Sequence, residues 1–193
     1  MMPAMLTQRI EQQFIDSADF KYQCGQVLAT TLSAAVDALL AGLTSGGKVL
    51  CAGAGPTAAL ASYVSHLLLS GFERERPELG ALCLTQSDGE EAQSLVKRLR
   101  ALSVAEDVLL VISVVRAEGS LMPLIEAAQD RGMTVVALVG GEGGDLVDCL
   151  LDTDVVISVT HPRLGRILEV QHMVLHALCD GIDAQLLGDD NKE

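Results

Sequence analysis

The sequence predicts a single α/β domain: a three-layer αβα sandwich around a five-stranded, parallel, doubly wound sheet, with helices before the sheet and a long helix after it. Three observations carry this prediction. The 193 residues are enough for one domain with a sizeable core. Near-continuous Val, Leu and Ile runs recur along the chain, as in strands that are covered on both faces. Helical segments separate these runs, which implies right-handed crossovers between parallel strands.

Each expected strand is a short apolar run bounded by glycine or polar residues. The expected strands are 48–52, 80–84, 107–113, 134–139 and 154–158. The helices between them show the apolar spacing of an amphipathic helix. They are 57–72, 90–102, 121–131 and a short one at 145–150. Because the chain has three Phe, two Tyr and no Trp, the core between these layers must be mainly aliphatic.

Long helical segments flank this α/β core. One domain is expected over 1–187, with two N-terminal helices in 1–45, the core in 46–160 and the C-terminal helix in 161–187. The tail 188–193 is expected to be disordered. The last helix is apolar on most of its sides, so a partner subunit in a homodimer or homotetramer is its expected cover.

Composition restricts the partners and the compartment. A formal net charge of −13 argues against direct binding to nucleic acid and against docking on an anionic membrane. The N-terminus lacks the pattern of a signal peptide, and no apolar stretch reaches the ~20 residues that span a bilayer. Five scattered cysteines without a CxxC pair are typical of reduced thiols, so a cytoplasmic location is expected.

The loop after the first strand is a candidate ligand site. It reads Gly53-Ala-Gly-Pro-Thr57 and leads into a helix N-terminus, at the edge where open parallel sheets bind ligands. Glycines let the backbone approach a phosphate, and the helix end supplies free N–H groups. A tight turn with Thr57 as the helix N-cap explains the same residues equally well.

Several motifs together give the chain a family resemblance. They are the G-x-G-x-T loop, a third strand ending in Ile-Ser113, the segments 72–77 (FERERP) and 133–138 (MTVVAL), Arg166-Ile-x-Glu169, and Leu178-Cys-Asp-x-Ile-Asp183. The chain resembles the sugar isomerase (SIS) domain family over nearly its whole length. The similarity is to the branch that contains phosphoheptose isomerase and the bacterial initiator-associating protein, a partner of the replication initiator DnaA. The 178–183 motif favours the second.

The resemblance implies a sugar-phosphate site, and the sequence departs from it. The implied contacts are Gly53, Gly55, Thr57, Ser113, Arg116 and Ser120. In the first loop Ala54 replaces an Asn of the family pattern, and Pro56 removes a backbone donor. In the second loop Val114 cannot donate, and Glu118 adds a negative charge to an anion site. These changes predict a degraded phosphate pocket.

The catalytic set that the resemblance implies is also incomplete. His176 matches the catalytic His of phosphoheptose isomerase, but Leu67 stands in place of the catalytic Glu, and Tyr63 and Leu168 replace implied metal ligands. No metal or other cofactor is therefore expected. A separate alternative is a metal held by Glu169, His172 and His176, which share one helix face, although no second ligand-bearing helix is visible.

These features lead to a non-catalytic adaptor as the expected function. The resemblance implies an oligomer that binds DnaA through Leu186 and Leu187, and packing at the end of the last helix explains these leucines equally well. The alternative is a phosphoheptose (sedoheptulose 7-phosphate) isomerase, with His176 and a base drawn from His66, Glu169 or a neighbouring subunit. A non-catalytic sugar-phosphate-binding protein that uses Thr57, Ser113 and Arg116 is the third possibility.

Overall fold

The computed structural model describes residues 2–85, 92–114, 119 and 121–188, and it confirms the predicted α/β class. Five parallel strands form one sheet in the order β2-β1-β3-β4-β5. The strands are β1 (Val49–Gly53), β2 (Ala81–Leu84), β3 (Val108–Ile112), β4 (Thr134–Gly140) and β5 (Val155–Val159). The helices are α1 (Met2–Thr44), α2 (Ala58–Ser70), α3 (Ala92–Leu102), α4 (Met122–Gln129), α5 (Gly144–Asp148) and α6 (Leu164–Leu187), with a 3₁₀ turn η1 (Gly55–Thr57) before α2.

Alternation along the strands divides the core into two halves, and this confirms the three-layer prediction. Val49 and Cys51 of β1 pack with α1, α2 and α6 on one face of the sheet. Leu50 and Ala52 pack with α3, α4 and α5 on the other face. Successive side chains of a strand point to opposite faces, so a strand with helices on both sides must be apolar throughout. All five residues of β1 and all five of β3 are buried.

The N-terminal region is one helix of 43 residues, so the prediction of two helices in 1–45 was wrong. No proline interrupts it after its first turn, and Gly25 lies where an added Cβ would meet nothing within 4 Å. The helix ends at Thr44, and Gly46, with φ +88°, forms the turn that follows it. A helix continues through polar positions when nothing breaks its hydrogen-bond ladder, and no helix-breaking signal separates the two apolar patterns.

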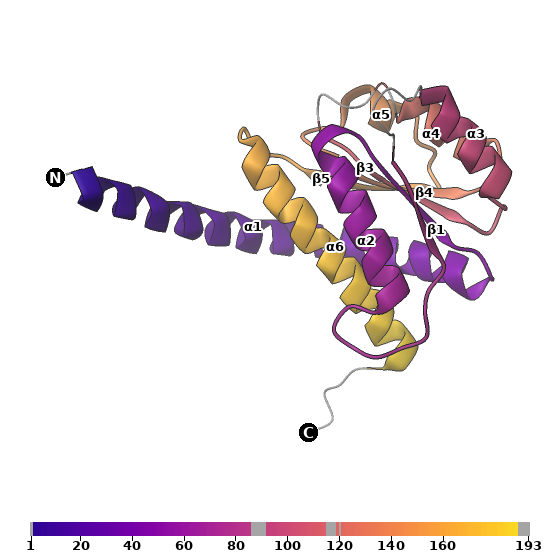
Figure 1. Ribbon diagram of the computed structural model, residues 1–193, viewed down its shortest axis with the longest axis horizontal. Helices are drawn as coiled ribbons and strands as arrows, with labels where there is room; N and C mark the ends of the chain where they lie inside the picture. The colour runs from indigo at the N-terminus through magenta and orange to yellow at the C-terminus, as the bar shows by residue number, and fades with distance from the viewer. Residues whose placement is uncertain (1, 86–91, 115–118, 120, 189–193) are drawn as a thin grey trace.

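The two halves of α1 have different surroundings. Its C-terminal half packs against α6 and β5, and Gln13 and Ser17 also bond α6, whereas its N-terminal end extends away from the body (Figure 1). Apolar side chains on the first 27 residues are largely exposed: Met5, Leu6, Ile10, Phe14, Ile15, Tyr22 and Val27. By length and composition alone α1 is also apolar enough to cross a membrane, contrary to the expectation that no segment would be. Core helices of soluble proteins meet the same criterion, and Leu28 and Leu39 of α1 are buried in the core.

The segment after α2 is fixed to α6 by one arginine. Arg76 donates to the carbonyl oxygens of Leu67 and Leu68 at the end of α2, and its Nε donates to Asp183 of α6. Both charged side chains are almost completely buried. The pair therefore satisfies helix-end carbonyls and holds α2 and α6 side by side, which sets one side of the cleft described below. Of the predicted tail, Gly188 follows α6, and 189–193 lie outside the described residues.

Candidate functional site

A cleft of about 610 Å³ opens between α1, the β1–α2 connection and α6. It lies at the carboxyl end of β1, beside β3, where the strand order 2-1-3-4-5 reverses direction. That reversal is the usual ligand site of a doubly wound sheet. The lining residues are Lys21 from α1, Pro56 and Leu60 from the β1–α2 region, and Gly165, Leu168, Glu169, His172, Met173 and His176 from α6.

The 53–57 loop owes its shape to its own hydrogen bonds. A Cβ on Gly53 would lie 2.4 Å from the carbonyl oxygen of Thr57, and Gly55 has φ +58°, so both positions favour glycine. The Thr57 hydroxyl is fully buried; it accepts from the Ala54 N–H at 3.1 Å and donates to the Ile112 carbonyl at 2.6 Å. Thr57 precedes α2 without capping it through its side chain. The tight-turn interpretation therefore describes this conformation, and phosphate contacts by Gly53, Gly55 and Thr57 stay predictions.

The second predicted loop is only partly described. Ser113 follows β3 and is 1% exposed. Its carbonyl oxygen accepts from the Gly140 N–H and from the side-chain amide of Gln171 on α6, at 2.7 Å. Arg116 and Ser120, predicted as phosphate contacts, lie outside the described residues. Gln171 thus links α6 to the carboxyl end of β3, a role that no sequence pattern indicated.

An aromatic cluster surrounds His176 on the helical side of the cleft. The Tyr63 Oη of α2 and the His176 Nε2 are 2.8 Å apart and share a hydrogen bond. The rings of His172 and Phe72 pack on His176 at centroid distances of 4.8 and 4.9 Å. Burial, together with the positive charges of His176 and Lys21, lowers the pKa of His172 below its usual value. The imidazole of His172 is therefore more readily neutral than an ordinary histidine side chain, and a neutral imidazole can accept a proton.

The residues present do not fit the metal that the resemblance implies. Leu67, in place of the catalytic Glu, is buried in the core, and Tyr63 already bonds His176. Within the described ranges no group of three or more His, Cys, Asp or Glu side chains could hold a metal ion, which includes the alternative set of Glu169, His172 and His176. His66, one of the candidate bases, is exposed on α2 beside Ser70 and does not line the cleft.

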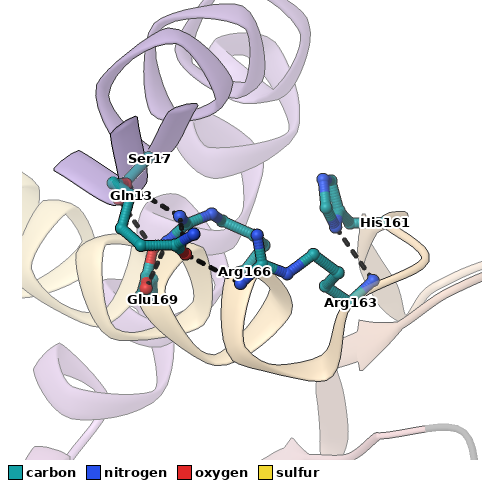
Figure 2. Close-up of polar contacts among 6 residues, drawn as sticks. All are labelled: Gln13, Ser17, His161, Arg163, Arg166 and Glu169. Atoms are coloured by element: carbon teal, nitrogen blue, oxygen red, sulfur yellow. Dashed lines mark hydrogen bonds and ion pairs between the residues drawn. The ribbon is translucent and has the colours of Figure 1, made fainter. Parts of the chain in front are cut away.

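Glu169 is held in place by a polar network between α6 and α1, shown in Figure 2. Arg166, 4% exposed, donates to both carboxylate oxygens at 2.6 Å, and Ser17 of α1 donates to one of them. Arg166 also donates to the Gln13 carbonyl, while Arg163 reaches the Gln13 side chain. Burial alone would raise the pKa of Glu169, but the hydrogen bonds from Ser17 and Arg166 and the Arg166 charge outweigh it, so this pKa lies below its usual value. A carboxylate held in this way is a weak base.

The predicted partner-binding leucines lie far along the same helix. Leu186 and Leu187 form the end of α6 and are 40% and 41% exposed. Neither lines the cleft. Their exposure means that they do not complete the core, but exposure does not identify a partner.

Comparison with known proteins establishes the family. The family model described as SIS domain matches residues 15–140. The chain belongs to the SIS domain family. Phosphoheptose isomerase of Methylibium petroleiphilum is 40% identical over 97% of this chain and 98% of its own, and that of Azoarcus sp. is 41% identical over 95% and 98%.

Solved structures agree with this SIS assignment. Phosphoheptose isomerase from Neisseria gonorrhoeae superposes with a TM-score of 0.81 at 32% identity, covering 93% of this chain and 99% of that one. The Francisella tularensis phosphoheptose isomerase gives 0.84 at 31% identity, covering 92% and 97%. The DnaA-binding adaptor function was therefore wrong: full-length relatives at 36–41% identity are phosphoheptose isomerases. The 178–183 motif that favoured the adaptor is a segment of α6 whose Leu178, Cys179, Ile182 and Asp183 are buried, so packing within this fold accounts for these four residues.

Proposed function

We propose that this SIS-domain protein binds a sugar phosphate of the heptose phosphate class in the α1–α6 cleft. The observation that carries the proposal is the cleft itself: about 610 Å³ at the carboxyl end of β1, lined by Lys21, His172 and His176. Its volume suits a small ligand, and its polar groups can bond hydroxyl and phosphate oxygens. The relatives at about 40% identity carry the name phosphoheptose isomerase, which supports the heptose class.

Isomerisation is the second candidate, and the His176–Tyr63 pair favours it. An aldose–ketose isomerisation removes a proton from a carbon beside the carbonyl, returns a proton at the neighbouring carbon, and moves one between the two oxygens, with no net redox change. A general base and an acid are needed. The imidazole of His176 and the phenol of Tyr63, 2.8 Å apart, are two groups able to exchange a proton at the cleft. Glu169 is the weaker candidate because its carboxylate is held by Arg166.

Thermal unfolding with and without sedoheptulose 7-phosphate tests binding. Ligand at a hundredfold excess over its Kd stabilises the native state by about 2.7 kcal/mol, which raises Tm by roughly 5–10 °C in a chain of this size. The same sample in D₂O, followed by NMR, tests turnover through deuterium at the carbon beside the carbonyl. Binding without exchange identifies a non-catalytic binding protein, and the absence of any stabilisation contradicts the proposal.

A Tyr63→Phe variant separates the two candidates further. It removes the hydroxyl that bonds His176 but keeps the ring that packs on His172. If the pair catalyses isomerisation, exchange falls while thermal stabilisation by the ligand remains. His66→Gln is the matched control, because this exposed histidine of α2 lies outside the cleft.

Self-association accompanies this function in our proposal. The N-terminal end of α1 extends from the body (Figure 1). Seven large apolar side chains between Met5 and Val27 are exposed, more than a monomer in water is expected to leave uncovered. A second copy is the simplest cover, and it would lie next to Lys21 of the cleft. Light scattering of the parent and of a Phe14→Glu variant tests this: we expect a dimer or tetramer that the variant weakens, and a monomeric parent contradicts it.

A further inference from the structure

Three of the five cysteines gather in one half of the core. Cys51 of β1, Cys83 of β2 and Cys179 of α6 belong to the half that α1, α2 and α6 cover. Burial raises the pKa of Cys51 well above its usual value, and the charges of Cys83 and then Cys179 raise it further, as expected for neighbouring thiols. All five cysteines are free thiols. Cys51 therefore has two neighbours with which it could form a disulfide.

The pairing of the strands favours Cys83 as the partner of Cys51. The two residues lie directly opposite each other across the parallel strands β1 and β2, and both side chains face the same half of the core. Neighbouring strands lie about 4.8 Å apart, and a disulfide joins Cα atoms about 4.4–6.8 Å apart, so the backbone already has the spacing of a bridge. Because β2 is a four-residue strand at the edge of the sheet, the small shift that closes the bond moves no second strand.

The two thiols differ in their access to solvent. Cys51 is completely buried, whereas Cys83 is only partly buried. Burial raises the pKa of Cys83, while hydrogen bonds from the hydroxyls of Thr85 and Ser62 and the charge of Arg98 lower it. Cys83 is thus the thiol that a small oxidant meets first, and Cys51 lies behind it. Because burial prevails at Cys83, its thiolate is scarce at neutral pH and becomes more abundant as the pH rises.

We propose that Cys83 and Cys51 form a thiol-oxidation site that reacts with hydrogen peroxide or a small alkyl hydroperoxide and yields a disulfide between β2 and β1. The Cys83 thiolate attacks a peroxide oxygen, the O–O bond breaks, and Cys83 becomes a sulfenic acid while the peroxide leaves as water or an alcohol. The Cys51 sulfur then attacks the Cys83 sulfur, the S–O bond breaks, and the hydroxyl group leaves as water with the Cys51 proton. The two thiols give up two electrons and two protons, and the peroxide accepts them.

The buried thiol determines the fate of the exposed one. A sulfenic acid without a second thiol in reach is oxidised further to a sulfinic acid, which is not readily reversed, whereas a disulfide can be reduced again. Cys51 therefore protects Cys83 from irreversible oxidation. The same bond joins the edge strand to β1 just before the 53–57 loop.

Peptide mapping of the folded, full-length protein tests the site. The reduced chain is treated with hydrogen peroxide, remaining thiols are alkylated, and the tryptic peptides are identified by mass spectrometry. Trypsin places Cys51 and Cys83 in different peptides, 49–74 and 75–97, so a bridge between them is seen as one linked mass. We expect this pair to be the main disulfide and to form faster at pH 9 than at pH 7.

Two alanine variants separate the roles of the neighbouring thiols. In Cys51→Ala we expect the linked mass to disappear and Cys83 to be recovered as the sulfinic acid. Cys179→Ala is the matched control, because it removes the other buried thiol beside Cys51, and we expect it to form the bridge to the same extent as the parent. The map of the parent by itself tests the proposal even where a variant folds poorly.

The unfolded chain supplies the second comparison. Cys24 is nearer to Cys51 in the sequence than Cys83 is, so in urea the Cys51–Cys83 link should lose its predominance. The same predominance in urea would mean that the fold does not direct the pairing, and the proposal would be wrong. It would also be wrong if the folded parent linked Cys51 to Cys179, or if Cys83 stayed reduced at a peroxide concentration that oxidises Cys24 and Cys149.

Discussion

The two walls of the cleft are built in opposite ways. The loop wall, 53–57, uses its polar groups on itself: Thr57 bonds Ala54 and Ile112, and Gly53 is required by the close approach of the Thr57 carbonyl. The helical wall, from α1 and α6, leaves Lys21 and His172 open to the cleft. One wall is therefore shaped by backbone sterics, whereas the other is defined by the side chains that it presents.

This difference indicates where chemistry can change within a fold. Substituting a residue that closes the loop disturbs the carboxyl end of β1, so few residue types are tolerated there. A side chain on the helical wall, such as Leu168 or Met173, can change without moving the backbone. The SIS fold can thus be kept while side chains on the helical wall change.

Removing Arg166 should give the largest effect, because the helical wall depends on it. Arg166→Met takes away a buried cation that bonds Glu169 and Gln13, and it leaves a partly buried carboxylate without its partner. We expect the free energy of unfolding to fall by about 3 kcal/mol. Urea denaturation measures this loss.

The matched control is Arg163→Met. Arg163 is exposed and makes one side-chain contact to the same Gln13 (Figure 2). An exposed contact of this kind contributes less than about 1 kcal/mol. Equal losses in the two variants would mean that the Arg166 network does not support the wall.

Sequence patterns predicted the strands of the sheet better than the N-terminal helix. The central strands were found because they are buried on both faces and therefore form apolar runs, as at 48–52 for β1 and 134–139 for β4. The edge strands β2 and β5 are only partly buried, but they are apolar enough to show the same pattern. The length of α1 was missed because two apolar patterns with a polar stretch between them look like two helices. The absence of a proline after the first turn was the local signal of one continuous helix, and the change of apolar pattern concealed it.

The site was only half predictable for a similar reason. The resemblance and the β1–α2 loop pointed to His176 and 53–57, which lie on or beside the cleft. Gln13, Ser17 and Lys21 were missed, since their roles come from the packing of α1 against α6, some 150 residues away in the chain. Tertiary contacts of this kind leave no spacing signal.

An intermediate effect is expected from the loop wall. Thr57→Val keeps the shape of the side chain but leaves the Ala54 N–H and the Ile112 carbonyl without their hydroxyl partner. Unsatisfied buried groups cost about 1–3 kcal/mol, so we expect unfolding at lower urea concentration by that amount. Thr160→Val is the control, because its exposed hydroxyl bonds only the Gly141 carbonyl. If Thr57→Val were as stable as the parent, the loop would not depend on its internal bonds, and the contrast between the walls would fail.

The smallest effect is a pH dependence that isolates the helical wall. Because the pKa of His172 is lower in the folded protein than in the unfolded chain, the unfolded state binds more protons at mildly acidic pH. The lowered pKa of His172 has no effect on the free energy of unfolding above pH ~7, where the histidine is neutral in both states. As the pH falls from the ordinary histidine pKa of about 6.5 toward the pKa of His172 in the folded protein, the free energy of unfolding decreases. The lowered pKa of Glu169 acts in a separate, more acidic window.

Urea midpoints between pH 7.5 and 5 should therefore decline less steeply in His172→Gln than in the parent, whereas His66→Gln should keep the parent's slope. An unchanged slope in His172→Gln would mean that burial and the charges of His176 and Lys21 do not lower the pKa of His172, and the contrast between the helical wall and the loop would then fail.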